Sequence, residues 1–342
     1  MSNRLLFIGE FPPPYGGGTI KDSLLRDEVF GDQRVLTFDL YDFKRQKSSF
    51  LVHCANFLRA IIWAEKLVVG VGSNSRLSML LGIIAAFKGR SFLKNITVFM
   101  MGRDLPEYLS RNTKQLWKYR AVRCIFAESY SLIIDFERLG INNVRYLPNF
   151  RKGDRARPPR SVGDVVHFVY FAQVRPEKGI DTLVAAVKML NGEGFRDRFD
   201  VAVYGRIIEG YEEEFDSLIA QVPNMAYKGF LDASTDDVCA ELNQYDCSSS
   251  SSWQEGMSGA NIECKFAGIA NIVSDAGFNS ECVTDGVDGL LVKPRNSASL
   301  ADAMCRCVED RNLLTHLKQA SFESRTEYDV AEWRLEVLDV VG

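Results

Sequence analysis

Short apolar runs alternate with longer amphipathic stretches along the whole chain. Such runs predict buried strands, and the stretches between them predict helices. In the first half, the predicted strands are Leu5–Gly9, Arg34–Leu40, Leu67–Val71, Ile96–Met101, Cys124–Ala127 and Val144–Leu147. In the second half, they are Val165–Val174, Phe199–Tyr204, Met225–Gly229, Tyr245–Ser252 and Asn271–Asp275. Regular alternation of strands and helices indicates an α/β architecture with parallel sheets covered on both faces.

A break in this alternation divides the chain. Pro148-Asn149-Phe150 ends the last strand of the first half, and residues 151–164 are rich in Arg, Pro and Gly without apolar periodicity. We therefore predict a domain over residues 1–150, a linker over 151–164 and a second domain over 165–330. An amphipathic helix is predicted over residues 331–342.

The predicted helix Ser49–Ala64 has an apolar face that allows two interpretations. Four apolar residues recur on that face at helical spacing: Leu51, Ala55, Leu58 and Ile62. Basic residues precede the helix within residues 44–47. Such a helix can lie at a membrane interface or pack against the sheet, and the sequence leaves both open.

Charge is distributed unevenly between the two halves. Residues 1–150 carry 21 Lys and Arg against 13 Asp and Glu, whereas residues 151–342 carry 20 against 32. A basic first half suits contact with an anionic membrane or a pyrophosphate-linked acceptor, although an ordinary solvated surface is the alternative. We expect no nucleic-acid partner.

Composition and apolar runs indicate a globular cytoplasmic protein. The chain is 46% hydrophobic and 25% charged. The run Leu5–Ile8 is short and is interpreted as a strand, not a signal peptide, and Met79–Phe87 is too short to span a bilayer. None of the eight cysteines forms a C-x-x-C pair, which favours free thiols in a reducing compartment.

The segment from Ser251 to Glu263 carries the most chemical information. It follows a predicted strand, contains a glycine-rich turn, and continues into a helix that precedes another strand. Such a turn directs backbone N–H groups and a helix N-terminus at an anion or a polar ligand. Carboxylates stand at Glu255 and Glu263. The alternative is that Glu255 caps the helix and Glu263 lies on a solvated face.

This segment resembles the E-x7-E motif of the retaining GT-B glycosyltransferases called family 4 or group 1. Two further stretches are similar to that family: Arg175–Asp181 to its P-E-K-G-I-D segment, and Asp285–Val292 to its D-G-x-x-G-x-L-V segment. The resemblance covers about residues 165–310. It implies a GT-B fold, with two Rossmann-like parallel-sheet domains facing a cleft and a last helix that returns to the first domain.

The resemblance also implies roles for individual residues. Glu255 would accept hydrogen bonds from hydroxyls of the transferred sugar, Glu263 would bind the ribose hydroxyls, and Lys178 would clamp the diphosphate. Glu255 and Lys178 are the catalytic candidates. The donor-binding candidates besides Glu263 are Gly256, Met257, Ser258, Gly259, Gln173, Arg175 and Arg206.

The chain departs from the family pattern at two positions. Gln173 stands where the family has an arginine, so Arg175 or Arg206 would have to compensate. Met101-Gly102 replaces the usual His-Gly, which leaves Arg103 and Asp104 as the polar groups of that loop.

A glycine-rich loop in the first half resembles the first loop of the family, which lies in the cleft. Its glycines Gly16, Gly17 and Gly18, together with Arg103 and Asp104, are the candidates for the acceptor side. A simple tight turn is the alternative for the glycines. No D-x-D triplet and no His/Cys cluster with metal-ligand spacing occurs, so we expect no metal and no cofactor besides the co-substrate.

Together these features predict a retaining, metal-independent glycosyltransferase. It would move a sugar from a UDP- or GDP-sugar to a saccharide or lipid-linked acceptor, at the inner face of the cytoplasmic membrane. A role in surface polysaccharide or lipopolysaccharide assembly rests on family analogy. One alternative is a non-catalytic GT-B scaffold, which Gln173 and Met101 favour. Another is a GT-B sugar-nucleotide epimerase, against which the shortage of histidines argues.

Overall fold

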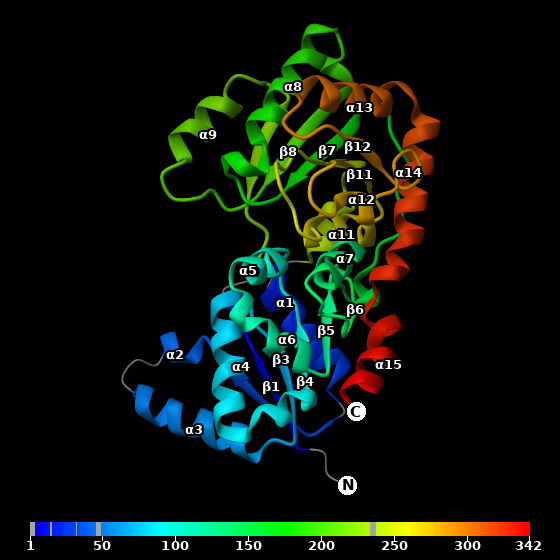
Figure 1. Cartoon of the computed structure of the whole chain (residues 1–342). Helices are drawn as coiled ribbons and strands as arrows, with labels where there is room; N and C mark the ends of the chain where they lie inside the picture. The colour runs from blue at the N-terminus through cyan, green and yellow to red at the C-terminus, as the bar shows by residue number, and fades with distance from the viewer. Residues whose placement is uncertain (1–3, 14–15, 32, 46–48, 233–236) are drawn as a thin grey trace. The chain divides into compact units, whose positions relative to one another are not determined.

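The computed structural model describes residues 4–13, 16–31, 33–45, 49–232 and 237–342. The chain divides into two compact units (Figure 1). Unit 1 comprises Met1–Phe150 and Val330–Gly342, and unit 2 comprises Arg151–Asp329. Residues 151–164, which we predicted to be a linker, belong to unit 2, where the Arg157 N–H donates to the Phe266 carbonyl at 2.7 Å.

Unit 1 contains a six-stranded parallel sheet with the strand order β2-β1-β3-β4-β5-β6. Its strands are β1 (Leu5–Gly9), β2 (Val35–Asp39), β3 (Lys66–Gly70), β4 (Ile96–Phe99), β5 (Cys124–Ala127) and β6 (Val144–Tyr146). Leu5 pairs with Val35 on one side and Lys66 on the other, so β1 lies between β2 and β3. The central strands are buried along their length, as parallel strands covered on both faces are.

The helices of unit 1 follow from capping and apolar periodicity. They are α1 (Gly17–Leu24), α2 (Asp42–Arg45), α3 (Phe50–Trp63), α4 (Asn74–Lys88), α5 (Leu105–Arg111), α6 (Leu116–Ala121), α7 (Tyr130–Arg138) and α15 (Val330–Val341). The side chains of Ser73 and Ser129 cap α4 and α7 by accepting backbone N–H groups of the first turn. In α15, Val337 and Val340 enter a core that also contains Phe7.

Helix α3 packs through a face other than the one that its apolar pattern singled out. Phe57, Ala60 and Ile61 are buried against unit 1. Leu51 and Ile62, which belong to the predicted apolar stripe, are 81% and 58% exposed. Of the two interpretations left open, packing of this stripe against the sheet is therefore wrong, because α3 is apolar on two faces and only the other one is covered.

Unit 2 contains a second six-stranded parallel sheet, with the order β12-β11-β10-β7-β8-β9. Its strands are β7 (Val166–Phe171), β8 (Phe199–Tyr204), β9 (Met225–Gly229), β10 (Cys247–Ser250), β11 (Ala270–Ser274) and β12 (Leu290–Val292). Its helices are α8 (Ile180–Gly192), α9 (Glu212–Ile219), α10 (Val238–Leu242), α11 (Gly259–Phe266), α12 (Asn279–Cys282), α13 (Ser297–Glu309) and α14 (Arg311–Ser324). The two parallel sheets confirm the predicted α/β class.

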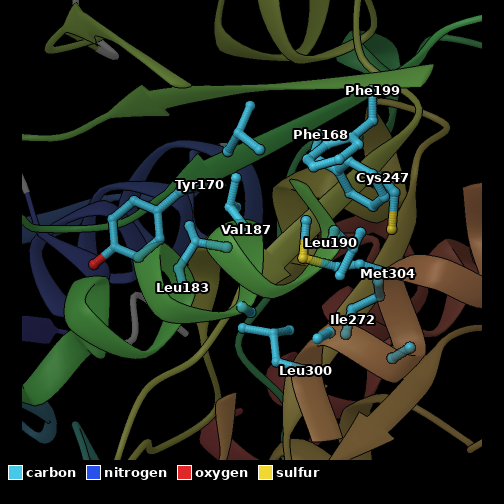
Figure 2. Close-up of a cluster of buried hydrophobic side chains, with 14 of the residues drawn as sticks. Phe168, Tyr170, Leu183, Val187, Leu190, Phe199, Cys247, Ile272, Leu300 and Met304 are labelled. Atoms are coloured by element: carbon cyan, nitrogen blue, oxygen red, sulfur yellow. The ribbon is translucent and has the colours of Figure 1, made fainter. Parts of the chain in front are cut away.

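The main core of unit 2 lies between one face of the sheet and the helices that cover it (Figure 2). Phe168 of β7 and Phe199 of β8 meet edge to face, with their ring centroids 6.0 Å apart. Leu183 and Leu190 of α8 and Met304 of α13 belong to the same buried cluster. This burial fixes β7 and α8, and therefore fixes the loop that joins them.

The strands predicted from the sequence are present, but several are shorter than predicted. β7 ends at Phe171 instead of Val174, and β10 spans only Cys247–Ser250, because the chain turns into loops at the carboxyl edge of the sheet. Residues 14–15 of the glycine-rich loop and residues 233–236 before α10 lie outside the described residues. Within the described part of the chain, no helix is both long and apolar enough to cross a membrane.

Candidate active site

The strand order of unit 2 creates one topological switch point. From β7 the chain proceeds to β8 and β9 on one side, whereas β10, on the other side of β7, leads to β11 and β12. The loops after β7 and β10 therefore leave the sheet side by side and turn in opposite directions. Ligands of open α/β sheets bind at such a point, outside the carboxyl ends of the strands. Lys178 and Glu255 lie on these two loops.

Lys178 and Glu255 form an ion pair across the switch point. The Lys178 ammonium donates to Oε1 of Glu255, and the two side chains are 18% and 10% exposed. The Ser252 hydroxyl donates to the same oxygen at 2.7 Å. Glu255 is thus held by two donors in a largely desolvated position, where charge-assisted hydrogen bonds are strong.

Backbone contacts hold the two loops together. Gly179 has a φ of +72°, and a Cβ atom there would lie 2.0 Å from the Ser251 carbonyl oxygen. The Ser251 hydroxyl donates to the Gly179 carbonyl at 2.6 Å, and the Trp253 N–H donates to the Glu177 carbonyl at 2.9 Å. Only glycine allows this approach, so the sequence requires Gly179 immediately after Lys178.

A second glycine supports Glu255 from another loop. Gly277, after β11, has a φ of +62°, and a Cβ atom there would lie 1.7 Å from the Glu255 carbonyl oxygen. The Ser274 hydroxyl, at the end of β11, donates to the Ser252 carbonyl at 2.5 Å. The main chain around Glu255 is therefore fixed from the β7 side and from the β11 side.

The turn after Glu255 leads into α11. Around Gly256 there is open space, since no atom lies within 4 Å of a Cβ built there. Met257 is buried, and Ser258 is the N-cap of α11, its hydroxyl accepting the Asn261 N–H at 3.4 Å. The helix begins at Gly259. The candidates Gly256 to Gly259 thus form the turn at a helix N-terminus, where backbone N–H groups favour a negative charge.

Glu263 lies inside α11 and is paired with an arginine that the sequence analysis missed. Nε of Arg151 donates to Oε1 of Glu263 at 2.7 Å, and both side chains are nearly buried, with 10% and 12% exposed. The alternative interpretation of Glu263 as a solvated surface residue is therefore wrong. The two residues are 112 positions apart, so no local pattern in the sequence relates them.

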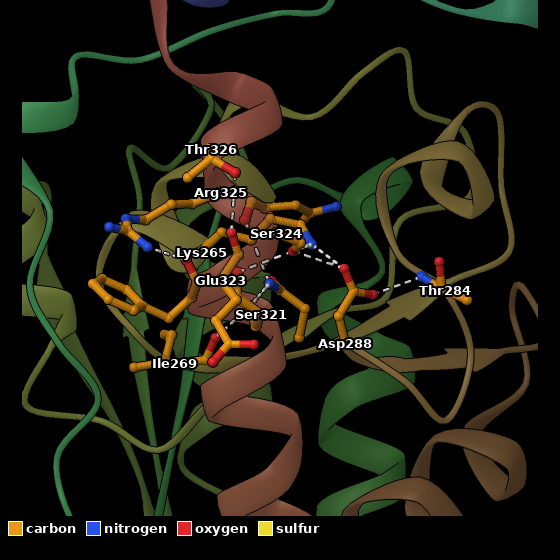
Figure 3. A network of polar contacts seen from close by, with 12 residues as sticks. Lys265, Ile269, Thr284, Asp288, Ser321, Glu323, Ser324, Arg325 and Thr326 are labelled. Atoms are coloured by element: carbon orange, nitrogen blue, oxygen red, sulfur yellow. Dashed lines mark hydrogen bonds and ion pairs between the residues drawn. The ribbon is translucent and has the colours of Figure 1, made fainter. Parts of the chain in front are cut away.

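A buried polar network fixes α11, the helix that carries Glu263 (Figure 3). The fully buried Lys265 of α11 donates to Asp288 at 2.5 Å and to the Ser324 hydroxyl at 2.7 Å. Asp288 also accepts the Thr284 N–H at 2.7 Å. Because every charge in this group is compensated, it orients α11 without leaving an unpaired buried ion.

The loop after β7 contains the candidates Gln173 and Arg175. Gln173 is exposed, and its main-chain carbonyl accepts a hydrogen bond from the Tyr170 hydroxyl at 3.1 Å. Nε of Arg175 lies 3.8 Å from the Glu177 carboxylate. Burial, and secondly the charge of Glu255, raise the pKa of Tyr170 well above its usual range, so this phenol stays a neutral donor beneath the loop.

Arg206 lies on the neighbouring loop after β8. Its guanidinium stacks on the Phe230 ring, 4.8 Å from the ring centroid. The Val174 N–H donates to the Arg206 carbonyl at 3.0 Å, which joins the two loops. Arg206 therefore lies at the same carboxyl edge of the sheet as Lys178. Its guanidinium stacks on Phe230 and is not part of the Lys178–Glu255 ion pair.

The acceptor-side candidates lie at the carboxyl edge of the unit 1 sheet. Gly16 is the N-cap of α1 and Gly17 is its first residue. A Cβ atom on Gly18 would lie 3.6 Å from the side chain of Met101, so the glycine loop and the loop after β4 meet. Arg103 and Asp104 form an ion pair with a 3.4 Å separation.

The sequence analysis also missed a polar cluster at the switch point of unit 1, between β1 and β3. Glu10 accepts hydrogen bonds from Arg76 at 2.7 Å and from the Gly72 N–H at 3.2 Å. The Glu10 N–H donates to the buried Asp22 carboxyl at 2.8 Å. The position of Glu10 directly after an apolar strand is the signal that could have found it.

Among the described residues, no group of three or more His, Cys, Asp or Glu is arranged to hold a metal ion. The groups gathered at the unit 2 switch point are instead an ammonium, carboxylates, hydroxyls and the amides of a helix N-terminus. Such groups bind hydroxyls and anionic oxygens, which are the functional groups of sugars and phosphates.

Comparison with known proteins relates this geometry to a family and a fold. Residues 166–310 match the family described as glycosyl transferases group 1. No curated protein sequence matches the chain. HepE from Anabaena in complex with UDP superposes with a TM-score of 0.76 at 16% identity, covering 99% of both chains.

Two further solved structures are similar. Sucrose-phosphate synthase from Thermosynechococcus elongatus has a TM-score of 0.76 at 14% identity, covering 99% of this chain and 98% of the other. TarM from S. aureus, in a complex with fondaparinux, α-GlcNAc-glycerol and UDP, has a TM-score of 0.64 at 16% identity, covering 86% and 59%. The chain thus has a GT-B fold, and the part of it that contains Lys178, Glu255 and Glu263 matches the group 1 glycosyltransferases.

Proposed function

We propose that this protein is a retaining, metal-independent glycosyltransferase that uses a nucleotide diphosphate-sugar donor. The observation that carries the proposal is the Lys178–Glu255 pair at the switch point of unit 2. This pair lies inside the segment that matches the group 1 glycosyltransferases. A cation and a hydrogen-bonding carboxylate at that point suit a diphosphate and a sugar, respectively.

Lys178 is the proposed stabiliser of the leaving group. Its ammonium is paired with Glu255, so the charge is already positioned and largely desolvated. As the bond between the anomeric carbon and the diphosphate oxygen breaks, negative charge grows on the diphosphate. A fixed cation in a site of low dielectric stabilises that charge without having to reorganise.

Glu255 is the proposed partner of the sugar hydroxyls. Ser252 keeps its carboxylate in place, and Gly277 leaves no freedom in the main chain behind it. Open space around a Cβ atom built on Gly256 means that the turn does not itself block a sugar beside this carboxylate. The turn from Gly256 to Gly259 would supply backbone N–H groups to the sugar or the phosphates.

Glu263 is the proposed ribose ligand, and Arg151 fixes its orientation. Nε of Arg151 donates to Oε1 of Glu263, and a carboxylate offers about four acceptor positions. The ribose hydroxyls would bind acceptor positions of Glu263 other than the one that Arg151 engages. Gln173, Arg175 and Arg206 would line the phosphate side of the site, with Arg175 supplying the charge that Gln173 lacks.

Retention of configuration is proposed to proceed on one face of the sugar. The acceptor oxygen forms its bond to the anomeric carbon on the face from which the diphosphate departs, and the acceptor proton passes to a diphosphate oxygen. This step needs no histidine, which fits Met101 at the position where the family has one. Gly16, Gly17, Gly18, Arg103 and Asp104 are the proposed acceptor contacts.

UDP is the first donor nucleotide to test, with GDP second. HepE has been solved with UDP-glucose, and TarM with UDP and saccharides, which supports a UDP-sugar donor and a saccharide acceptor here. We further propose a lipid-linked acceptor and a role in surface polysaccharide assembly. The eight free cysteines support action in a reducing cytoplasm, at the inner face of its membrane.

The first test is calorimetric binding of UDP, GDP, ADP and TDP to the full chain, in buffer containing a metal chelator. We expect one nucleotide to bind the unaltered protein and Glu263→Ala to lose that binding. Glu213→Ala, which removes an exposed carboxylate of α9, is the matched control and should bind normally. If no nucleotide binds the unaltered protein, the assignment of the donor site is wrong.

The second test separates an enzyme from a non-catalytic scaffold, the alternative that the exposed Gln173 amide favours. The protein is incubated with the sugar donor of the nucleotide that binds and with a set of saccharide acceptors, and donor cleavage and the anomeric configuration of the product are followed by NMR. An enzyme of the proposed class gives a product of retained configuration, and Lys178→Met suppresses it. Tight nucleotide binding without any turnover in the unaltered protein would support the scaffold.

A further inference from the structure

A cavity of about 470 Å³ lies on the face of the unit 2 sheet that is turned away from the main core. Val166 and Phe168 of β7 enter that core, so His167 between them points to the opposite face. Asp200 of β8 is the register partner of His167 and lies on the same face. Both line the cavity, together with Arg160, Lys228, Gln244 and Tyr245. These side chains are polar, so the cavity suits a polar ligand.

The cavity is separate from the proposed donor site. His167 and Asp200 are the second residues of β7 and β8, at the amino ends of these strands. Lys178 and Glu255 follow the carboxyl ends of β7 and β10. Because β7 has six residues, its two ends lie about 17 Å apart. A ligand in the cavity would therefore not compete with a nucleotide for the Lys178–Glu255 pair.

Two cations of the cavity lack a counter-ion. The Asp200 carboxylate is engaged by His167, whose Nδ1 lies 2.9 Å from Oδ2 and 3.0 Å from Oδ1. Among the described residues, neither the Arg160 guanidinium nor the Lys228 ammonium has a hydrogen-bond or ion-pair partner. Residues 151–342 carry 32 Asp and Glu against 20 Lys and Arg, so this pair of cations reverses the charge of its surroundings. Such a pair attracts an anion.

Two hydrogen-bond acceptors line the same cavity. The Tyr204 hydroxyl donates its only proton to Glu241 at 2.5 Å, so the Tyr245 hydroxyl, 3.0 Å away, donates to the Tyr204 oxygen. The lone pairs of the Tyr245 oxygen thus remain as acceptors. Nε2 of Gln244 donates to Glu241 at 2.8 Å, which leaves Oε1 of Gln244 as the second acceptor. Acceptors of this kind bind hydroxyl groups.

We propose that this cavity binds a hexose phosphate. The phosphate would lie between Arg160 and Lys228, and the sugar hydroxyls would donate to Tyr245 and Gln244. Arginine and lysine form strong charge-assisted hydrogen bonds to phosphate oxygens. The volume lies within the range of small-molecule sites, about 300 to 1,000 Å³. This second site goes beyond the proposed transfer reaction and does not depend on it.

The experiment is titration calorimetry of the full chain with glucose 6-phosphate and glucose 1-phosphate, and separately with glucose and with inorganic phosphate. We expect at least one hexose phosphate to bind about tenfold or more tightly than either of its parts, because it engages both the cations and the acceptors. The double variant Arg160→Gln/Lys228→Gln should weaken this binding at least about tenfold. Tyr245→Phe should weaken it about fivefold and leave the affinity for inorganic phosphate unaltered.

Arg306→Gln/Lys293→Gln is the matched control. It removes one arginine and one lysine from exposed positions of the same unit that do not line the cavity, so it should bind hexose phosphate normally. Since Arg160 and Lys228 are also exposed, their double variant should keep the melting temperature and the nucleotide binding of the unaltered protein.

The donor-site variants Lys178→Met and Glu263→Ala distinguish the two sites. Both should retain hexose phosphate binding, whether or not the proposed transferase function is correct. Loss of that binding in either variant would place the ligand at the donor site and overturn the proposal. The proposal is equally wrong if no hexose phosphate binds, if the Arg160→Gln/Lys228→Gln variant binds it normally, or if inorganic phosphate binds as tightly.

Discussion

At the switch point of unit 1, Glu10 is paired with Arg76; at that of unit 2, Glu255 is paired with Lys178. The arginine is 44% exposed, whereas the lysine is only 18% exposed. The surroundings of the two ion pairs differ more than the exposure of their cations does. In unit 2 the loops are locked by main-chain contacts at Gly179 and Gly277, and in unit 1 a buried carboxyl, Asp22, fills the corresponding space.

Asp22 of α1 is held between the last residues of two strands. A Cβ atom on Gly70 would lie 2.0 Å from Oδ1 of Asp22, and one on Gly9 would lie 3.0 Å from Oδ2. Oδ1 accepts no hydrogen bond from the described residues. The same kind of sheet therefore supports two kinds of site: in unit 2 main-chain contacts hold the loops around the ion pair, and in unit 1 a buried carboxyl stands beside it.

The largest expected effect comes from breaking the main-chain lock of unit 2. Gly277→Ala would place a methyl group 1.7 Å from the Glu255 carbonyl oxygen, in a left-handed conformation, so we expect a loss of more than about 3 kcal/mol of stability. The measurement is the free energy of unfolding by urea. Gly210→Ala is the control, because Gly210 has a φ of +84° and open space, so it should lose only about 1 kcal/mol. Equal losses of stability in the two variants would show that the close contact at Gly277 does not hold the main chain of Glu255 in place.

The next effect concerns chemistry at the two switch points. Lys178→Met should lower kcat about 100- to 1000-fold, as expected for removal of one preorganised charge from the transition state. Arg76→Met removes the cation of the unit 1 pair, which is more exposed, and should lower kcat far less. The measurement is donor turnover under saturating substrate. If both variants lose activity to the same extent, the two pairs do not differ in role.

A smaller effect is expected at the ion pair beneath Glu263. Arg151→Met should weaken nucleotide binding about tenfold, which corresponds to one charge-assisted hydrogen bond, and leave kcat nearly unchanged. Titration calorimetry and steady-state kinetics measure the two quantities. Arg157→Met, which removes a more exposed ion pair with Asp237, is the control. A lower kcat with normal nucleotide affinity would contradict a positioning role for Arg151.

The smallest effect depends on pH in unit 1. Burial, and then the charge of Glu10, raise the pKa of the Asp22 carboxyl well above the usual range of an aspartate. The folded state thus binds this proton more tightly than the unfolded state. Its contribution to stability is therefore full below the pKa of the unfolded state and is lost as the pH rises through the pKa of the folded state.

Asp22→Asn removes this titration. The Tm of the variant relative to the unaltered protein should therefore increase from acidic to neutral and alkaline pH. Asp302→Asn, on an exposed part of α13, should show no such trend. If the Tm of the variant instead falls relative to that of the unaltered protein as the pH rises, Asp22 does not titrate as a buried carboxyl.

Most strands were predictable because they are short runs rich in apolar residues between polar loops, as in Phe199–Tyr204, whose observed ends equal the predicted ones. Lys178 and Glu255 were singled out from motifs on two loops, but the ion pair between them was not predicted. Arg151 and Glu10 were missed because their roles depend on partners 112 and 66 residues away. The exposed stripe of α3 was ambiguous because periodicity shows that a face is apolar but not what covers it.

The ends of unit 2 lie next to each other. Arg151, its first residue, pairs with Asp329, its last, in a parallel bridge, and the Arg151 N–H donates to the Tyr328 carbonyl at 2.8 Å. In topological terms, unit 2 is an insertion within the chain of unit 1, entered and left at one point. A single continuous fragment, residues 151–329, therefore holds the whole proposed donor site. Because its two ends are neighbours, the corresponding segment of another transferase could be joined to unit 1 at the same two positions.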